Sequence, residues 1–320
     1  MKYLGLAALA WCSMASATIL PVGPREWHPG AEECTPETTR TEIQEITDRT
    51  FVLRQNPCVD YEANLVYLLL GSKRALLIDT GAVEGAAAAP LVEWVRLALE
   101  RTGEGRLSLL VVHSHGHQDH RAGDQAFAAL PDTEIAPHEG DALREFLGFK
   151  DWPNSLGQID LGDRIVDLIP TPGHHEDHIV FYDRKSQILF TGDFLLRGKL
   201  LVDDLDAYQA SAQRVADFLK VHPVEQVQGA HIELDITGAA YPGGATFHPH
   251  ESVRPLTTLD VHNLPAALAD FNGFYSRHPN FIVVNPIHNL LALATGVIVA
   301  LAFLGWLARW LWLRRRIRSS

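Results

Sequence analysis

Seven consecutive residues of this chain carry most of the groups that can bind a metal ion. The segment Ser114-His115-Gly116-His117-Gln118-Asp119-His120 contains three imidazoles and a carboxylate, directly after an apolar run. These are the ligands that zinc takes where no thiolate is offered. In extended backbone, side chains two positions apart point the same way, so His115 and His117 can share one ion. Asp119 and His120 then face elsewhere and can serve a second ion. A polar surface loop would explain one or two of these residues, but hardly all four.

Three further candidate ligands follow in order along the chain, each just after a run of strand character. His174 ends the turn Thr171-Pro172-Gly173-His174, Asp193 ends Phe190-Thr191-Gly192-Asp193, and His231 ends Gly229-Ala230-His231. Each has a glycine within two positions, which lets the backbone approach closely. Strand ends that converge on one edge of a sheet sandwich would bring these side chains together.

This ordered series resembles the metallo-β-lactamase superfamily, whose pattern is H-x-H-x-D-H followed by a histidine, an aspartate and a final histidine. The resemblance runs from about Thr41 to His231, and Ile78-Asp79-Thr80-Gly81 matches a further hallmark of the family. It implies an α/β fold, the αββα four-layer sandwich of the metallo-β-lactamase type, and two Zn²⁺ ions. It assigns the metal ligands as His115, His117 and His174 on one zinc, Asp119, His120 and His231 on the second, and Asp193 bridging both.

Five other histidines are interpreted as lying outside the ligand set. His113 is a strand-end residue or one that orients a ligand. His175 and His178 flank the third histidine ligand. His178 either contacts substrate, orients a ligand or belongs to a polar strand edge. His248 and His250 have the spacing of a ligand pair, but the seven-ligand set is already complete. We therefore interpret them as surface or pocket-wall residues.

Two adjacent divalent ions indicate hydrolysis. Zinc lowers the pKa of bound water towards neutrality, and a second ion stabilises the charge that develops on a leaving group. Asp119 is the predicted catalytic residue, because it is placed to orient the nucleophile and transfer its proton. We therefore predict a zinc-dependent hydrolase of a small-molecule ester, lactone, thioester or amide.

Alternative activities remain open at this point. The persulfide dioxygenases resemble this fold and keep much of the motif with a single iron, but the complete second ligand set favours two zinc ions. True β-lactamases of the superfamily usually have cysteine or serine at the position of Asp193, so β-lactam hydrolysis is expected only as a minor activity. Glyoxalase II-like thioesterases share the full ligand set, although the basic residues that would hold their glutathione-linked substrate find no match. A non-enzymatic binding module is disfavoured because no ligand position is missing.

Composition sets the class of protein. The chain has 320 residues, of which 47% are hydrophobic, and a net charge of -12. This length can bury a substantial core. The acidic balance argues against a nucleic-acid partner, because phosphate binding draws on clustered Lys and Arg. Cys34 and Cys58 remain once the predicted signal peptide is removed; a disulfide and two free thiols are equally consistent with them.

Both ends are predicted to direct the protein to a membrane. Residues 1–17 end in Ala15-Ser16-Ala17 after an apolar run, as in a signal peptide. Cys12 raises a lipoprotein alternative, which the preceding Trp11 disfavours. The stretch Leu290 to Ala308 has 19 residues without a charge, enough to cross the hydrocarbon core, and an arginine cluster follows. A buried core helix is the disfavoured alternative. We predict a single-pass membrane protein with its catalytic domain extracytoplasmic (periplasmic in a Gram-negative cell), unless the helix is a sorting signal that is removed.

The predicted organisation follows from these features. It comprises a signal peptide at 1–17, an N-terminal segment at 18–40, a hydrolase domain at 41–275, a linker at 276–288, a transmembrane helix at 289–313 and a basic cytoplasmic tail at 314–320. Hydrophobic periodicity predicts strands at Glu42–Arg54, Asn64–Leu70, Arg74–Ile78, Leu109–Val112, Arg164–Ile169, Ile179–Tyr182, Gln187–Phe190 and Val224–Val227. It predicts helices at Ala86–Arg101, Asp124–Leu130, Glu139–Leu147, Asp206–Val221 and Pro255–Phe274.

Overall fold

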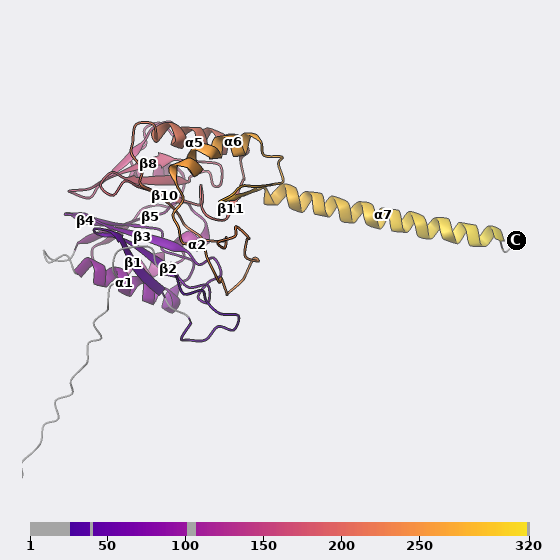
Figure 1. The fold of residues 1–320 in the computed structure, drawn as a ribbon, viewed down its shortest axis with the longest axis horizontal. Helices are drawn as coiled ribbons and strands as arrows, with labels where there is room; N and C mark the ends of the chain where they lie inside the picture. Colours follow the sequence, from indigo (N-terminus) through magenta and orange to yellow (C-terminus); the bar gives the residue numbers. More distant parts are fainter. Residues whose placement is uncertain (1–25, 39–40, 101–106, 319–320) are drawn as a thin grey trace, which may run out of the picture.

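Two β-sheets lie face to face and helices cover their outer faces, which gives the four layers predicted from the sequence (Figure 1). The computed structural model describes residues 26–38, 41–100 and 107–318. The predicted signal peptide, residues 18–25 and 39–40 of the predicted N-terminal segment and residues 319–320 of the predicted tail lie outside the described residues.

The first sheet has six strands in the order β1-β2-β3-β4-β5-β6, and the second has five in the order β12-β10-β9-β8-β7. The strands of the first sheet are β1 (Thr41–Thr47), β2 (Thr50–Gln55), β3 (Leu65–Leu70), β4 (Arg74–Ile78), β5 (Ser108–Val112) and β6 (Thr133–Ile135). Those of the second are β7 (Gly157–Asp160), β8 (Ile165–Pro170), β9 (Ile179–Asp183), β10 (Ile188–Gly192) and β12 (Gln226–Gly229). A small third sheet joins β11 (Lys199–Leu201), β14 (Ile282–Val284) and β13 (Tyr275–Arg277).

Most helices pack on the outer face of a sheet or connect strands near one edge, whereas the last one extends away from the body (Figure 1). They are the 3₁₀ helix η1 (Gly85–Ala87), α1 (Ala89–Glu100), α2 (Gln118–Arg121), α3 (Asp124–Ala128), α4 (Gly140–Phe146), α5 (Leu205–Phe218), α6 (Thr258–Ala269) and α7 (Pro286–Arg318). In Figure 1, α1 covers the sheet of β1 to β6, whereas α5 and α6 cover the opposite sheet.

Alternation along single strands builds the cores between these layers. In β3, Leu65 and Tyr67 belong to the core between the two sheets, whereas Val66 and Leu68 belong to the core shared with α1. Side chains alternate across a strand, so a strand that is apolar at every position is buried on both faces. This is why β3 is buried along its whole length.

Two predicted elements differ in the structure. The predicted strand Glu42–Arg54 is an antiparallel hairpin, in which Thr47 pairs with Thr50 across a two-residue turn. Arg49 adopts a φ of 57° in that turn. The prediction was wrong because apolar residues continue on both sides of the turn without Gly or Pro to mark it.

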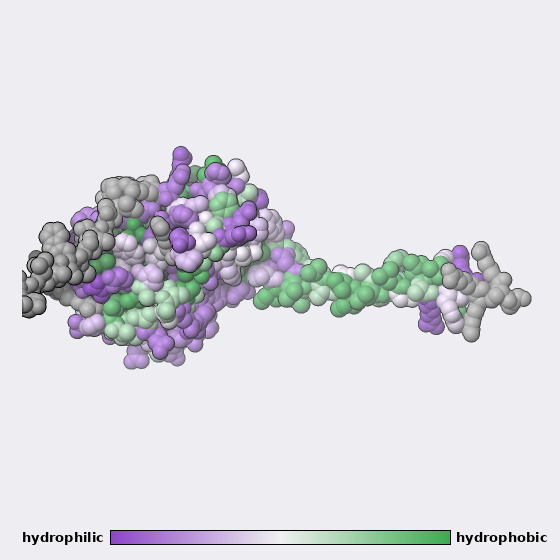
Figure 2. Space-filling model, turned by 90° about the horizontal axis from the view of Figure 1, so that it is seen from below, coloured by the Kyte–Doolittle hydropathy of each residue, from purple (hydrophilic) through white to green (hydrophobic). Residues whose placement is uncertain are grey.

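The other difference concerns the predicted linker at 276–288. Part of it is folded, because β13 and β14 pair with each other and β14 pairs with β11 in the body. Helix α7 then begins at Pro286 and extends away from the body (Figure 1). It is apolar over most of its length (Figure 2); an 18-residue stretch of it has a mean hydropathy of 2.4, and none of that stretch is buried. Its length and composition are therefore sufficient for a membrane span.

The two cysteines left open by the sequence form a disulfide. Cys34 and Cys58 have Cα atoms 5.5 Å apart. The bond ties the N-terminal segment to the loop that follows β2, close to the side of the sandwich where the predicted ligands lie.

Candidate metal centre

The structure brings all seven predicted ligands together at one edge of the two sheets. The short helix α2 follows β5 and contains Asp119 and His120, and His117 immediately precedes it. The remaining ligands follow the ends of three strands in the second sheet: His174 after β8, Asp193 directly after β10 and His231 after β12. The strands run so that these ends share one edge, and side chains far apart in the sequence therefore meet.

The first group consists of three imidazoles that face one another. His115 Nε2 lies 2.9 Å from His117 Nδ1, and His174 Nε2 lies 3.1 Å from His117 Nδ1 and 3.2 Å from His115 Nε2. The other ring nitrogen of His174 lies 3.1 Å from the backbone oxygen of Leu201, to which it donates. His174 Nε2 therefore carries no proton, and its lone pair is free to bind a metal. Nitrogens at these separations suit the bond lengths of about 2.0–2.1 Å that zinc makes to histidine.

The second group has two imidazoles and two carboxylates. Asp119 Oδ2 lies 3.0 Å from His120 Nε2 and 3.5 Å from His231 Nε2. Asp193 Oδ1 lies 3.5 Å and 3.3 Å from the same two nitrogens. His120 Nε2, His231 Nε2 and Asp193 Oδ1 are buried without a hydrogen-bond partner. Buried polar atoms without partners are costly, and these three converge on one point. Their chemistry and placement fit a divalent cation.

Asp193 lies between the two groups. Its Oδ1 faces His120 and His231, whereas its Oδ2 lies 3.6 Å from His174 Nε2 of the first group. Gly192, which precedes it, has a φ of 50°, and a Cβ there would lie 2.7 Å from the Cβ of Ser114. Only glycine fits this close, left-handed turn, so the turn that places Asp193 depends on Gly192.

Groups around the ligands fix the orientation of their rings. Asp79, which directly follows β4, has its Oδ2 2.9 Å from His120 Nδ1 and accepts hydrogen bonds from the backbone N–H and the hydroxyl of Ser114. His231 Nδ1 lies 2.7 Å from the carbonyl oxygen of Glu62. Such contacts hold a ring in place and determine which nitrogen is free to bind a metal.

His178 supports the turn at Asp193 rather than lining the cavity. It is fully buried, its Nδ1 lies 2.8 Å from Thr171 Oγ1, and its Nε2 accepts the backbone N–H of Asp193. Burial, together with the neighbouring imidazole of His174, holds the pKa of His178 well below its ordinary value. The neutral ring can therefore accept this hydrogen bond. Of the roles considered for His178, the structure supports orientation of a ligand.

In the metal-free protein, the two groups of ligands differ in their pKa values and therefore in their charge. Burial, reinforced by the imidazole of His120, keeps the pKa of His115 well below its ordinary value. For His120, the carboxylates of Asp79, Asp193 and Asp119 outweigh burial and raise the pKa well above it. Burial alone would raise the pKa of Asp193, but the imidazoles of His231 and His120 hold it far below. The carboxylate of Asp193 is therefore ionised, as a ligand of a cation must be, and a bound cation would take the place of the protons on the neighbouring imidazoles.

A cavity of about 270 Å³ opens onto both groups. Its walls include Lys199 and Leu201 of β11, Tyr61, and Ile232, which follows a ligand directly. Lys199 Nζ lies 3.4 Å from Glu233 Oε1, and both side chains are half-buried. The pKa of Tyr61 is raised to about 12, mainly by its hydrogen bond to Glu62 and the negative charge of that residue, and to a smaller extent by burial. A cavity that exposes potential metal ligands beside both polar and apolar walls can hold a small reacting group.

The other histidines are distributed as follows. His113 contacts Asp124 at 3.2 Å and lies outside both groups, as predicted. His248 lines the cavity, which is one of the two places, surface or pocket wall, that the sequence indicated for it. The orienting contacts made by Glu62 and Leu201 were missed, because both act through backbone carbonyls, which carry no signature in the sequence. Ser114 was named only as part of the motif, although its place beside Asp79 contributes to the site.

Comparisons with known proteins identify the family and the fold. The sequence matches the metallo-beta-lactamase superfamily over residues 60–257. It is 33% identical over 189 residues to the atrochrysone carboxyl ACP thioesterase of Claviceps purpurea (strain 20.1), a match that covers 55% of each protein. It is 29% identical over 204 residues to the acyl-coenzyme A thioesterase MBLAC2 of Gallus gallus, covering 53% of this chain and 72% of that protein. The chain spans about half the length of the fungal relatives that it matches.

Among solved structures, the metallo-beta-lactamase from Hirschia baltica is similar with a TM-score of 0.50 and 16% identity. That match covers 72% of this chain and 98% of the other. At this level of identity, the likeness concerns the fold alone.

Proposed function

This chain belongs to the metallo-β-lactamase superfamily, and on that premise we propose that it is a zinc-dependent hydrolase of small acyl thioesters. Among the bonds considered from the sequence, the thioester is favoured because the similar proteins from Claviceps purpurea and Gallus gallus are named as thioesterases. The aspartate at position 193 favours this over β-lactam hydrolysis, for which cysteine or serine is usual.

One observation carries the proposal. The second group presents three buried polar atoms without partners, on His120, His231 and Asp193, to the cavity edge where the imidazoles of the first group also converge. A structural cluster would satisfy these atoms with neighbouring protein groups. Their common direction is what a second bound cation requires, and it favours two zinc ions over the single iron of a dioxygenase.

We assign the residues as the two groups suggest. His115, His117 and His174 would hold one ion, and Asp119, His120 and His231 would hold the other, with Asp193 placed to serve both. Zinc held there would supply a nucleophilic water near neutral pH and polarisation of the substrate carbonyl. Asp119 faces the cavity, accepts a hydrogen bond from Asn64 Nδ2 at 3.4 Å, and orients and deprotonates the attacking water.

The experiment compares two aspartates of nearly equal exposure. Asp119 and Asp124 have side chains 28% and 29% exposed, but only Asp119 lines the cavity. Thiol release from a butanoyl thioester by the full chain should fall about 100-fold or more in Asp119→Asn, as for loss of a general base. It should change little in Asp124→Asn. Chelation should abolish the activity, and zinc should restore it.

Two results would refute this function. One is zinc-loaded protein that does not release thiol from any thioester. The other is activity that only iron and dioxygen restore, which would favour the dioxygenase.

We also propose that α7 crosses a membrane, with the body on the extracytoplasmic side and the end of the chain in the cytoplasm. The support is the apolar length of α7 and the arginine cluster at its far end. Protease added from outside should digest the body and spare residues 314–320. A body protected from external protease would contradict this orientation.

A further inference from the structure

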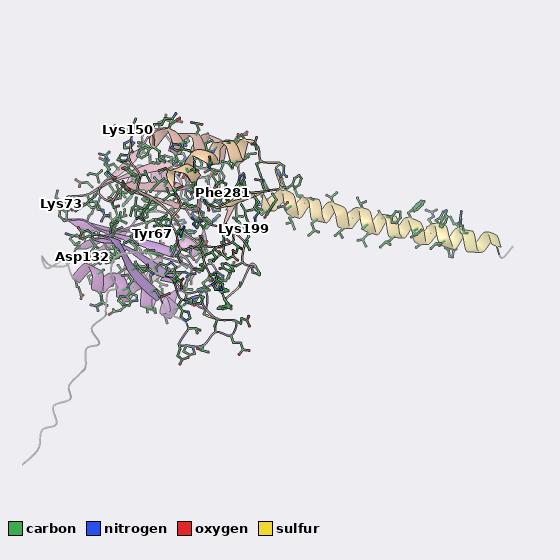
Figure 3. All side chains as sticks on the ribbon, in the orientation of Figure 1. Tyr67, Lys73, Asp132, Lys150, Lys199 and Phe281 are labelled. Carbon is green, nitrogen blue, oxygen red and sulfur yellow. A yellow bond between two sulfur atoms is a disulfide. The ribbon has the colours of Figure 1, made fainter. Side chains whose placement is uncertain are left out.

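The wall of the cavity is directly continuous with the base of α7. Lys199 and Leu201, both in the cavity wall, belong to β11, which pairs with β14 so that Leu201 is opposite Val284. Helix α7 begins two residues later, at Pro286. In Figure 3, Lys199 lies near the point where α7 leaves the body. The cavity is therefore on the same side of the body as the proposed membrane span.

The base of α7 is clamped to the body. The side chain of Asn285 accepts a hydrogen bond from the backbone N–H of His288 at the start of the helix. The ring of His288 lies 2.8 Å from the oxygen of Gly273, and the side chain of Asn289 donates to the oxygen of Phe274 at 3.0 Å. These bonds satisfy the two polar side chains of the first turn. They also fix the direction in which α7 leaves the body.

The apolar part of α7 begins almost at once. No charged residue occurs between Pro286 and Arg309. The 19-residue stretch from Leu290 to Ala308 spans about 28 Å, close to the thickness of the hydrocarbon core. The boundary of the hydrocarbon core on the side of the body then falls near Leu290. From the strand rise and the helix rise, Leu201 lies within about 15 Å of that boundary.

Two exposed aromatic residues lie beside the helix base. Phe274 is 45% exposed and Tyr275 is 47% exposed. The oxygen of Phe274 accepts hydrogen bonds from Asn285, just before α7, and from Asn289 in its first turn. Aromatic side chains at this height are typical of the membrane–water interface. Contact between this side of the body and lipid headgroups would account for their exposure at the base of α7.

We propose that the cavity lies at the bilayer surface and takes acyl thioesters that are held in the membrane by a long acyl chain. This rests on the thioesterase function and the membrane span proposed above. At about 270 Å³, the cavity is at the small end for a ligand site and holds the reacting group rather than a long chain. The bilayer within about 15 Å of its wall is the apolar phase that accepts the chain.

The protein offers a second binding location for the acyl chain of the substrate. An apolar cleft of about 290 Å³ lies between the sheets, lined by Trp27, Val52 and Leu65, and Ile232 belongs to the walls of both this cleft and the cavity. A chain bound there would give the same preference for long substrates. It would not depend on the distance between the body and the membrane, and that difference separates the two locations.

The test lifts the body off the membrane. The full chain is reconstituted in phosphatidylcholine vesicles with and without a Gly/Ser insertion of about 20 residues between Asn285 and Pro286, which spans roughly 25 Å. A hexadecanoyl thioester and a butanoyl thioester of the same small thiol are compared. The insertion should lower kcat/KM for the hexadecanoyl substrate by about 10-fold or more. The reason is that the longer linker lowers the effective concentration of the cavity at the membrane surface, where this substrate is held. The butanoyl substrate, dissolved in water, should be unaffected.

A second measurement tests the surface contact without activity. Spin labels are attached at Tyr275→Cys and, as the matched control, at Val221→Cys. Val221 is 76% exposed and follows α5 near the end of β9 that points away from the site. The label at position 275 should report the headgroup region of the vesicle, and the label at position 221 should report water.

The outcomes are distinct. If the insertion leaves the hexadecanoyl rate unchanged, or if the label at position 275 reports water, the interfacial proposal is wrong. A chain-length preference that survives the insertion assigns the acyl chain to the internal cleft. If the protein hydrolyses neither thioester, the proposed function itself fails, and the interfacial substrate class fails with it.

Discussion

The two ends of the same strands hold two kinds of buried polar cluster. At the metal-centre edge, β9 begins beside His178 and the ligands. At the other end, β9 finishes at Asp183, which accepts hydrogen bonds from Arg164 Nε at 2.9 Å and Nη2 at 2.6 Å. Arg164 also donates to the backbone oxygen of Arg49 at 2.9 Å and to the hydroxyl of Thr50. Arg164 and Asp183 are almost fully excluded from water, as are His115, His120 and His231 at the metal-centre edge, where Asp119 is partly exposed to the cavity.

The difference lies in which polar atoms have partners. Among the described residues, no side-chain atom of Arg164 or Asp183 is buried without a partner, whereas atoms of His120, Asp193 and His231 are. A satisfied buried ion pair is a structural element that joins the two sheets. Buried atoms left without partners and aimed at one point indicate a site built for a ligand. Burial and charge alone would not separate the two ends.

The largest expected effect breaks the structural cluster. Asp183→Asn removes the charge that balances buried Arg164 and should lower the free energy of unfolding by about 3–5 kcal/mol. Chemical denaturation measures this. The metal content of the folded variant should stay at the wild-type value. A fall in metal content without a loss of stability would mean that the two ends are not separable.

Asp193→Ser, at the metal-centre edge, should do the opposite. It removes the carboxylate that lies between both groups, so metal occupancy should fall. Thioester turnover should drop by at least the 10–100-fold seen when metal surroundings are disturbed. Metal analysis and steady-state kinetics check this. Two bound metals with near wild-type activity in this variant would show that Asp193 does not bridge. The case against β-lactam hydrolysis would then lose its main support.

Asp79→Asn tests the contact behind a ligand. Because Asp79 holds the ring of His120 through Nδ1, the substitution should weaken metal binding by about 10–100-fold without removing a ligand. Zinc titration against a competing chelator measures the affinity. An unchanged affinity would mean that other contacts position His120.

Acid should weaken the structural cluster in a defined window. Burial raises the pKa of Asp183, but its hydrogen bonds and charge interaction with Arg164 lower it further, so the folded pKa lies below the ordinary value of about 3.9. The stabilisation is fully present above that value and is lost as pH falls through the folded pKa. The stability gap between wild type and Asp183→Asn, both measured with chelator, should therefore shrink as pH is lowered from about 5. A gap that stays constant down to pH 2 would contradict this assignment.

The smallest effect is expected at the surface. Lys185 Nζ and Asp163 Oδ2 lie 2.6 Å apart near the same turn as Asp183, but their side chains are 38% and 40% exposed. Asp163→Asn should change the free energy of unfolding by less than about 1 kcal/mol. A loss comparable to that of Asp183→Asn would show that burial is not what distinguishes the two pairs.

Much of this molecule could be predicted from local pattern. Strand ends marked by glycine predicted where His174, Asp193 and His231 lie, and alternating or continuous apolar runs predicted most strands. The hairpin turn at Arg49 and the pairing of β13 and β14 with β11 could not be predicted. The first lacks a Gly or Pro at the turn, and the second depends on contact with a segment about 80 residues away in the sequence. The backbone carbonyls that orient His174 and His231 could not be predicted either, because any residue carries a backbone carbonyl.

The central claim is that two adjacent groups of ligands hold two zinc ions. Elemental analysis of the full chain, purified without added metal or chelator, tests it most directly. The account predicts about two zinc ions per chain, falling to about one or fewer in His120→Ala. One iron per chain, or a wild-type zinc content that His120→Ala leaves unchanged, would contradict it.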